Sequence, residues 1–246
     1  YPDDLLLGME QGSWKGRKMI RLITVSGPPS SGKTSVVLRA IDYLKTKRLK
    51  AGVVKFDCMR TYDDLVYEKN HIPVKVGLSG SLCPDHFFIS NIEECVPWGT
   101  RQGLDLLIIE SAGLCNRCAP HIKGSFAVCV IDNLSGVNTP KKIGPMLRLA
   151  DVVAITKGDI VSQAEREVFI FKVKQANPKA AVMSINGVTG QGVYDLGMLL
   201  ENAENLENLE GGRLRFSMPT ATCSYCLGET RIGQEHQRGY VRKMNW

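Results

Sequence analysis

The phosphate-binding loop pattern G-x-x-x-x-G-K-(S/T) is matched at every fixed position by Gly27-Pro28-Pro29-Ser30-Ser31-Gly32-Lys33-Thr34. A β-branched run at residues 21–26 precedes this loop, and apolar residues recur at helical spacing from Val37 to Leu44 after it. In a strand–loop–helix of this kind, backbone N–H groups and the helix N-terminus surround a polyphosphate. The sequence therefore predicts a nucleoside triphosphate site, and the alternative is an ordinary Gly/Ser turn into a helix.

The loop also supplies side chains for the phosphates and their metal ion. The Lys33 ammonium would reach the β- and γ-phosphates, and the Thr34 hydroxyl would bind Mg²⁺. The residues of this segment that we expect to contact the nucleotide are Gly27, Ser30, Ser31, Gly32, Lys33, Thr34 and Ser35.

The overall composition is that of a globular protein large enough for one α/β domain with appended elements. Of the 246 residues, 43% are hydrophobic and 23% are charged, which is ordinary for a soluble chain. No apolar run approaches the roughly 20 residues that span a bilayer, and no signal-peptide pattern is present, so we expect a cytoplasmic protein without a membrane span. The tail from Arg213 onward is basic, but a solvated terminus explains this more simply than nucleic-acid binding.

Short apolar runs alternate with helical patterns along the chain. Two helix starts are marked, by Thr139-Pro140 and by a capping box from Ser162 to Glu165. Strands that are apolar on both faces and alternate with helices form a parallel sheet covered on both sides. We therefore predict an α/β P-loop NTPase domain over residues 18–205 and a small C-terminal element over residues 206–246. The expected strands are residues 21–26, 52–57, 104–110, 126–132, 152–156 and 180–185.

Carboxylates follow two of the expected strands, at the sheet edge where ligands of such folds bind. Glu110 would organise the water shell of Mg²⁺, and the Gly113 amide would sense the γ-phosphate. Asp57, with Thr61 and then Asp63 or Asp64 after it, has the character of a switch segment that orients the attacking water or the ion. An ordinary turn or cap acid is the alternative for Asp57. The predicted catalytic residues are Lys33, Asp57, Glu110 and Gly113, and the predicted Mg²⁺ ligands are Thr34, Asp57 and Glu110.

Thr156-Lys157-Gly158-Asp159 ends another expected strand and fits an (N/T)-K-x-D pattern. The Asp159 carboxylate can accept from both the N1–H and the amino group of guanine, and Lys157 can lie across the purine. Asn186 lies in a Gly-containing loop, residues 184–192, that follows the last strand as a base-contacting loop should. This order of motifs favours GTP over ATP, with Thr156, Lys157, Asp159 and Asn186 as the base contacts.

Eight cysteines in a chain without a signal-peptide pattern favour metal ligation over a disulfide framework. Two pairs stand out, Cys115-x-x-Cys118 and Cys223-x-x-Cys226. A further thiol, Cys83, precedes an imidazole in Cys83-Pro84-Asp85-His86. Cys129 lies in an apolar run and is expected in the core. The candidate metal ligands are Cys115, Cys118, Cys223, Cys226, Cys83 and His86.

The order of these motifs over residues 20–200 resembles the nickel-insertion GTPases of hydrogenase and urease maturation, the HypB and UreG type. Cys83-Pro84-Asp85-His86 looks like the Cys-Pro-His of the urease chaperone with one residue inserted. The resemblance implies a homodimer that binds metal at its interface and uses GTP to control delivery to a client metalloenzyme. The thiol-rich segment around Cys115 and the tail with Cys223 depart from the family pattern.

Several readings of the thiols stay open at the level of sequence. The two Cys-x-x-Cys pairs can share a tetrahedral Zn²⁺ site, hold an iron–sulfur cluster, or form separate two-thiolate sites, and a structural zinc is the simpler reading of the tail pair. Our leading hypothesis is a GTPase that gates delivery of a metal to a client enzyme, with nickel favoured over zinc as that metal. The alternative is a nucleotide-driven iron–sulfur protein that activates or reduces a partner metalloenzyme. A small-molecule kinase would need a lid with several arginines, and a static binding module would show almost no turnover.

Overall fold

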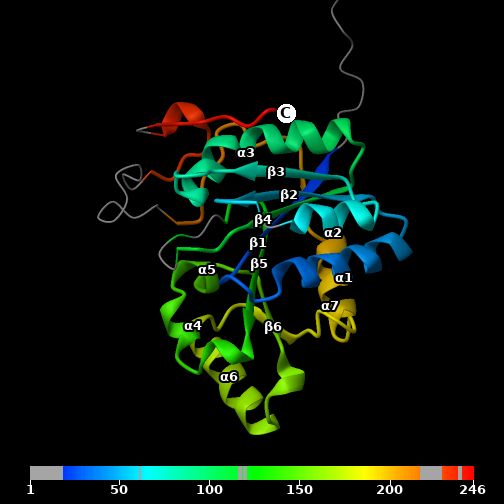
Figure 1. The fold of residues 1–246 in the computed structure, drawn as a ribbon, viewed down its shortest axis with the longest axis vertical. Coiled ribbons are helices and arrows are strands. Elements are labelled where there is room, and N and C mark those ends of the chain that lie inside the picture. Colours follow the sequence, from blue (N-terminus) through cyan, green and yellow to red (C-terminus); the bar gives the residue numbers. More distant parts are fainter. Residues whose placement is uncertain (1–18, 61, 116–117, 119–120, 217–228, 238–239) are drawn as a thin grey trace, which may run out of the picture.

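A twisted, mostly parallel sheet organises the molecule (Figure 1). The computed structural model describes residues 19–60, 62–115, 118, 121–216, 229–237 and 240–246. These residues form an eight-stranded sheet in which seven strands follow the order β3-β2-β4-β1-β5-β6-β7, all paired in parallel, and β8 pairs antiparallel with β1. The predicted fold class is therefore confirmed. The strands are β1 (Ile20–Ser26), β2 (Ala51–Asp57), β3 (Val74–Leu78), β4 (Leu106–Ser111), β5 (Phe126–Asp132), β6 (Val152–Thr156), β7 (Ala181–Ser184) and β8 (Asn205–Leu206).

Helices cover both faces of this sheet, as the sequence pattern predicted. The Ser162 capping box forms, because the Ser162 hydroxyl accepts from the Glu165 amide while the Glu165 carboxylate accepts from the Ser162 amide. None of the helices in the described part of the chain is long and apolar enough to cross a membrane. The helices are α1 (Lys33–Thr46), α2 (Asp63–Lys69), α3 (Pro84–Arg101), α4 (Thr139–Lys142), α5 (Pro145–Arg148), α6 (Gln163–Ala176) and α7 (Val193–Glu201), with 3₁₀ turns η1 (Asn133–Ser135), η2 (Gly158–Ile160) and η3 (Gln234–His236).

All six expected strands form, with ends that differ from the prediction by two residues at most. Two strands were not predicted, the two-residue β8 and the edge strand β3. Among the five residues of β3 only Gly77 is buried. Lys75 and Gly77 interrupt the apolar run of β3, which weakens its apolar signal, so the sequence pattern did not mark it.

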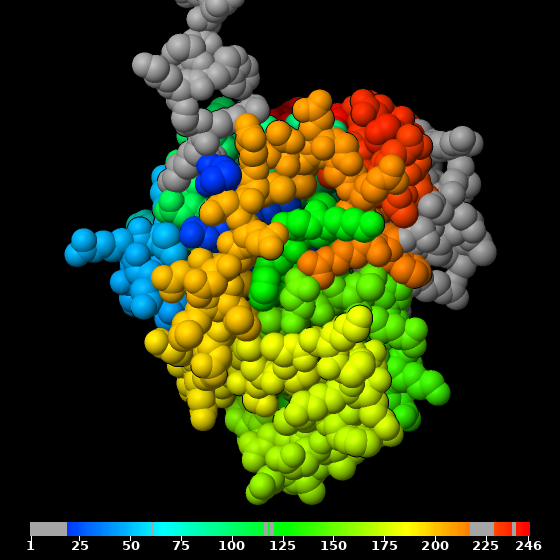
Figure 2. All heavy atoms as spheres, turned by 180° about the vertical axis from the view of Figure 1, so that it is seen from behind, coloured from blue at the N-terminus to red at the C-terminus, as the bar shows by residue number. Residues whose placement is uncertain are grey.

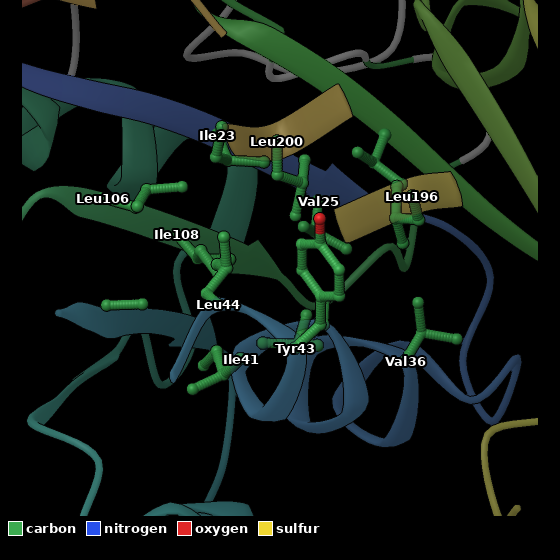
Figure 3. Packing of buried hydrophobic residues seen from close by; sticks show 14 of the residues in the cluster. Ile23, Val25, Val36, Ile41, Tyr43, Leu44, Leu106, Ile108, Leu196 and Leu200 are labelled. Carbon is green, nitrogen blue, oxygen red and sulfur yellow. The ribbon is translucent and has the colours of Figure 1, made fainter. Parts of the chain in front are cut away.

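Alternate residues of the central strands face two separate cores. Ile23 of β1 and Ile108 of β4 face α1 and α7, and Figure 3 shows them beside Leu44 of α1 and Leu200 of α7. Leu22 and Leu107, one position earlier on each strand, face the opposite core, which is built on α3. The strands nearest the phosphate loop are thus held from both faces. A third cluster packs β5 and β6 against α5 and α6.

The chain that follows α7 packs on the α3 side of the sheet. After α7 the chain forms β8 against the start of β1, and Leu214 then bridges to Ile122. Arg215 clamps this segment by donating to both carboxylate oxygens of Asp151 at 2.7 Å. Figure 2 shows the segment after α7 in orange, running to the C-terminal residues in red. The described residues of 206–246 share the core of α3, and the domain boundary at residue 206 stays a prediction.

Replacing Phe56 tests the α3-side core. Its ring is fully buried and makes edge-to-face contacts with Phe87 at 5.9 Å and Phe88 at 5.0 Å between centroids. We expect Phe56→Ala to lower the free energy of unfolding by about 3–5 kcal/mol, because it leaves a cavity. The matched control is Phe171→Ala on α6, where the ring is 57% exposed and the loss should stay within about 0.5 kcal/mol. Equal losses in urea titrations of the two variants would contradict this assignment of the core.

Candidate functional site

The phosphate loop joins β1 to α1 and leaves the start of that helix open. Gly32 is the N-cap residue of α1, with φ of 90°, and no side chain caps the first turn. The buried Ser31 hydroxyl likewise makes no hydrogen bond to any described residue. Free backbone N–H groups at a helix N-terminus attract anions. The loop therefore presents unfilled donors that fit the oxygens of a polyphosphate.

Lys33 lies inside this loop. Its ammonium donates to the carbonyl oxygens of Gly27 at 3.0 Å, Pro28 at 2.9 Å and Ala112 at 3.4 Å. Burial lowers the pKa of Lys33, and the charge of Glu110 opposes that shift. The contact with Ala112 is informative because it joins the loop to the segment that follows β4.

Glu110 is the centre of a hydrogen-bonded group of side chains beside the loop. Its Oε1 accepts from the Thr34 hydroxyl at 2.8 Å and lies 3.3 Å from the Lys55 ammonium, while Oε2 accepts from the Tyr67 hydroxyl at 2.6 Å. Burial, followed by the charge of Glu110, raises the pKa of the Tyr67 hydroxyl well above its usual value. Tyr67 therefore stays a donor at neutral pH.

Asp57 ends β2 at the same edge of the sheet. Its Oδ1 accepts from the Cys58 amide at 2.8 Å, and its Oδ2 lies 4.0 Å from the Lys55 ammonium. Asp63 forms a closer ion pair with the same lysine. Burial alone would lower the pKa of Lys55, but Glu110 and Asp63 outweigh it and raise that pKa. Thr61, which the sequence also suggested here, lies outside the described residues.

These groups line one cleft of about 450 Å³ with the phosphate loop. Thr34, Asp57 and Glu110, the three predicted Mg²⁺ ligands, all belong to it, as do Ser30, Gly32 and Ser35. Hydroxyl and carboxylate oxygens are the ligands that Mg²⁺ prefers. The donor set therefore fits Mg²⁺ held with a nucleotide phosphate.

The predicted base-binding residues lie next to the phosphate loop on its β6 side, opposite to Glu110 of β4. The Thr156 hydroxyl donates to the Ser31 carbonyl at 2.6 Å, and the Lys157 ammonium donates to the Ser30 carbonyl at 2.8 Å. Asp159 and Asn186 line a second cavity of about 520 Å³. The Asn186 side-chain oxygen accepts from two amides of its own loop, at 2.9 and 3.0 Å, so this residue also shapes the loop.

Gly113 is pressed against the phosphate loop. A Cβ built on it would lie 1.7 Å from the Gly27 carbonyl oxygen, and its φ is 70°. No residue other than glycine fits at this contact. The backbone of Gly113 thus lies against the first residue of the phosphate loop.

A group of metal-ligating side chains follows directly after this contact. The ligand atoms of Asp85, Cys115 and Cys118 all lie within 4.8 Å of one another. Asp85 and Cys118 are buried, and Cys115 is half-buried. Burial raises the pKa of Asp85 to about 6, and burial followed by the charge of Asp85 raises the pKa of the Cys118 thiol. A metal ion would replace the protons on these groups.

The sequence identified the two thiols of this group but not its carboxylate. Asp85 and His86 are consecutive residues at the start of α3, and successive helical positions point about 100° apart. Asp85 is the one that joins the thiols, while His86 is buried elsewhere in the same turn, where burial lowers its pKa. Cys83 interacts electrostatically with Cys118. Cys223 and Cys226 lie outside the described residues.

Two further side chains, Lys55 and Tyr67, were missed because their signal is not local. Lys55 stands within an apolar strand, and Tyr67 within a short helix. Only the register of β2 against β4, which pairs Lys55 with Glu110, brings that lysine to the site.

The comparisons with known proteins agree with this geometry. Residues 21–184 match the family described as CobW/HypB/UreG, nucleotide-binding domain. The chain belongs to this family. The resemblance to nickel-insertion GTPases of the HypB and UreG type is therefore confirmed at the level of the family.

Individual relatives span most of the chain. An uncharacterized protein of Methanocaldococcus jannaschii is 47% identical over 226 residues, or 92% of this chain and 97% of that protein. The urease accessory protein UreG of Yersinia enterocolitica serotype O:8 is 27% identical over 207 residues, covering 76% and 91%. Crystal structures of HypB share the fold. The structure of the Helicobacter pylori protein in complex with nickel has a TM-score of 0.58 at 18% identity and covers 75% of this chain and 89% of its own. The structure of the Archaeoglobus fulgidus protein has a TM-score of 0.56 at 20% identity and covers 74% of this chain and 89% of its own.

His121 lies just beyond the thiols and connects their segment to β1. Its Nε2 lies 3.0 Å from the Met146 carbonyl, which can only accept, so we assign the ring proton to Nε2. The other nitrogen, Nδ1, then accepts from the Thr24 hydroxyl at 2.9 Å. Burial lowers the pKa of His121 to about 4. The ring is therefore neutral in the folded protein, which makes it a structural residue and not a free base.

This burial predicts a pH dependence of stability. The pKa of His121 is about 4 when folded and about 6.5 when unfolded, so the unfolded chain binds more protons between these values. The contribution of His121 to stability is fully present above about pH 6.5 and falls by about 2 kcal/mol as the pH drops from 7 to 5. His121→Gln should lose less stability over this range, by the same amount, in urea titrations at both pH values. The control His71→Asn, at an exposed position, should keep the wild-type slope, and an unchanged slope in His121→Gln would contradict the prediction.

Proposed function

We propose that this protein is a GTPase that couples hydrolysis to the binding and release of a metal ion for a client metalloenzyme. One observation carries the proposal. The single segment from Glu110 to Cys118 contributes the carboxylate beside the Mg²⁺ ligands, the glycine against the phosphate loop, and two thiols of the metal-ligating group. A change at one end of so short a segment must act on the other.

For the nucleotide, we assign the phosphates to the loop from Gly27 to Ser35 and the base to the cavity of Asp159. Lys33 would exchange its carbonyl partners for the β- and γ-phosphate oxygens, and Mg²⁺ would neutralise the charge of the transferred group. Asp57, which lines the same cleft, would orient the attacking water. Water attack breaks the bond between the γ-phosphorus and its bridging oxygen, giving GDP and phosphate.

For the metal cargo, the donor set of Asp85, Cys115 and Cys118 combines one oxygen with two thiolates. Thiolates favour Zn²⁺, Cu⁺ and borderline ions such as Ni²⁺ over Mg²⁺. Three ligands leave room for at least one more, from Cys83, His86, the tail cysteines Cys223 and Cys226, or a second copy of the chain. The HypB structure in complex with nickel supports nickel as the cargo. A homodimer, which the family resemblance implies, would be the binding form.

The coupling follows from what each ligand is attached to. Asp85 begins α3, whose residues Phe87 and Phe88 are anchored in the core. Cys115 and Cys118 belong to a loop that touches the phosphate loop through Gly113. Arrival or loss of the γ-phosphate would displace Gly113 and move the thiols relative to the fixed carboxylate, which changes the affinity for the metal.

Asp159→Ala tests the base assignment. The carboxylate would make two charge-assisted hydrogen bonds to guanine, so its loss should weaken GTP and GDP binding by roughly 10- to 100-fold. ATP binding should stay as weak as in the wild type. Fluorescent-nucleotide titrations measure both, with Asp195→Ala in the first turn of α7 as the control. Equal binding of GTP by the Asp159 variant and the wild type would remove guanine specificity from the proposal.

Cys118→Ser tests the cargo site. In anaerobic titrations with Ni²⁺ and Zn²⁺ we expect at least a tenfold loss of affinity, because the variant loses a thiolate ligand, and weaker binding at lower pH as thiols keep their protons. Cys95→Ser is the matched control, since Cys95 is buried within α3 away from this group and its thiol contacts the Asn91 carbonyl.

The same titrations repeated with GTP and Mg²⁺ test the coupling. Metal affinity should differ between the nucleotide-free and the GTP-bound protein, and Cys118→Ser should abolish the difference. Identical affinities in both states would reduce the thiols to a structural site. Iron with acid-labile sulfide in the purified protein, accompanied by broad visible absorbance, would instead support an iron–sulfur protein.

A further inference from the structure

A lysine lies among the carboxylates that face the phosphate loop. The Lys55 ammonium is 3.3 Å from Glu110 and 4.0 Å from Asp57, and it forms a closer ion pair with Asp63. It is only 5% exposed and lines the same cleft as Thr34. A buried lysine with three carboxylate neighbours is a fixed counter-ion.

The fold holds this lysine in place from two directions. The parallel register of β2 and β4 sets Lys55 directly beside Glu110. The first turn of α2 brings Asp63 to the other side of the ammonium. Both oxygens of Glu110 then have partners without any ion, since Lys55 and the Thr34 hydroxyl contact one oxygen and the Tyr67 hydroxyl contacts the other.

Charge explains what this arrangement achieves. Three carboxylates around one cleft would attract a divalent cation by themselves. Lys55 and Lys33 reduce the net charge of the five groups from −3 to −1, and the ammonium lies against the carboxylate oxygens that a cation would need. A divalent cation must therefore overcome the repulsion of a buried positive charge at short range.

We propose that Lys55 is a built-in competitor of Mg²⁺ that keeps Asp57, Asp63 and Glu110 from binding a divalent cation until a nucleotide supplies additional negative charge. The inference rests on the proposed GTP site only for what brings Mg²⁺ in. Its consequence is that Mg²⁺ and nucleotide bind together, and that a divalent cargo metal is not held by the carboxylates of the empty cleft.

The test uses Mg²⁺ alone, without nucleotide. We expect millimolar Mg²⁺ to leave the melting temperature of the wild-type protein unchanged. Lys55→Gln should melt at a lower temperature, because its carboxylates lose their counter-ion, and Mg²⁺ alone should restore much of that loss. Calorimetry should show Mg²⁺ binding at least tenfold tighter in Lys55→Gln than in the wild type.

Two further variants serve as controls for this comparison. Lys55→Arg keeps the charge and should keep Mg²⁺ binding weak. Lys174→Gln removes an exposed lysine from α6 and should behave as the wild type. Equal Mg²⁺ binding by Lys55→Gln and wild type would overturn the proposal.

The wild type decides the question even where Lys55→Gln does not fold. Binding of Mg²⁺ to the nucleotide-free wild-type protein below millimolar concentration would contradict a competing role for Lys55. Failure of GTP to bind the wild type would instead overturn the proposed function. The Mg²⁺ comparison between wild type and variant would still stand, so the two failures are distinguishable.

Discussion

The parallel pairing of β1 with β4 is the constraint on which both candidate sites depend. It sets Glu110 beside Val25, two residues before the phosphate loop begins. The chain that leaves β4 must then pass over that loop, and Gly113 meets Gly27 so closely that a side chain would not fit. Cys115 follows Gly113 by two residues, so a short stretch of backbone ties its thiol to the loop.

Coupling between two sites also needs a part that does not move. The α3 helix provides it, since Phe87 and Phe88 at its start are buried against Phe56 of β2. Asp85 belongs to the same helical turn and is itself buried. In the proposed function, a metal held between Asp85 and the thiols would connect this anchored helix to the segment that follows Gly113, so a small shift at the phosphate loop would change the affinity for the metal.

The parts of this protein that the sequence predicted are those with a local signal. The phosphate loop is one uninterrupted motif, and the central strands are short apolar runs buried on both faces. The edge strand β3 has neither property. Lys55 reads as one polar residue in an apolar strand, and only strand register shows that it faces Glu110. Asp85 and His86 are adjacent in one helical turn, and their positions around the helix axis decide which of them reaches the thiols. The spacing of the cysteines in the sequence does not reveal this.

The proposed function requires two kinds of cation to be kept apart, Mg²⁺ for the phosphate chemistry and a cargo metal held by thiolates. Ligand softness keeps Mg²⁺ from Cys115 and Cys118, because thiolates are poor ligands for it. Ligand softness does not keep the cargo metal from the carboxylates, since oxygen ligands also bind Zn²⁺ and Ni²⁺. The Lys55 ammonium is paired with Asp63 and Glu110, and in our proposal it occupies the carboxylate cluster until nucleotide phosphates arrive. Under the proposed function the two metals would then share no ligand among the described residues, and the segment that begins at Glu110 would link them.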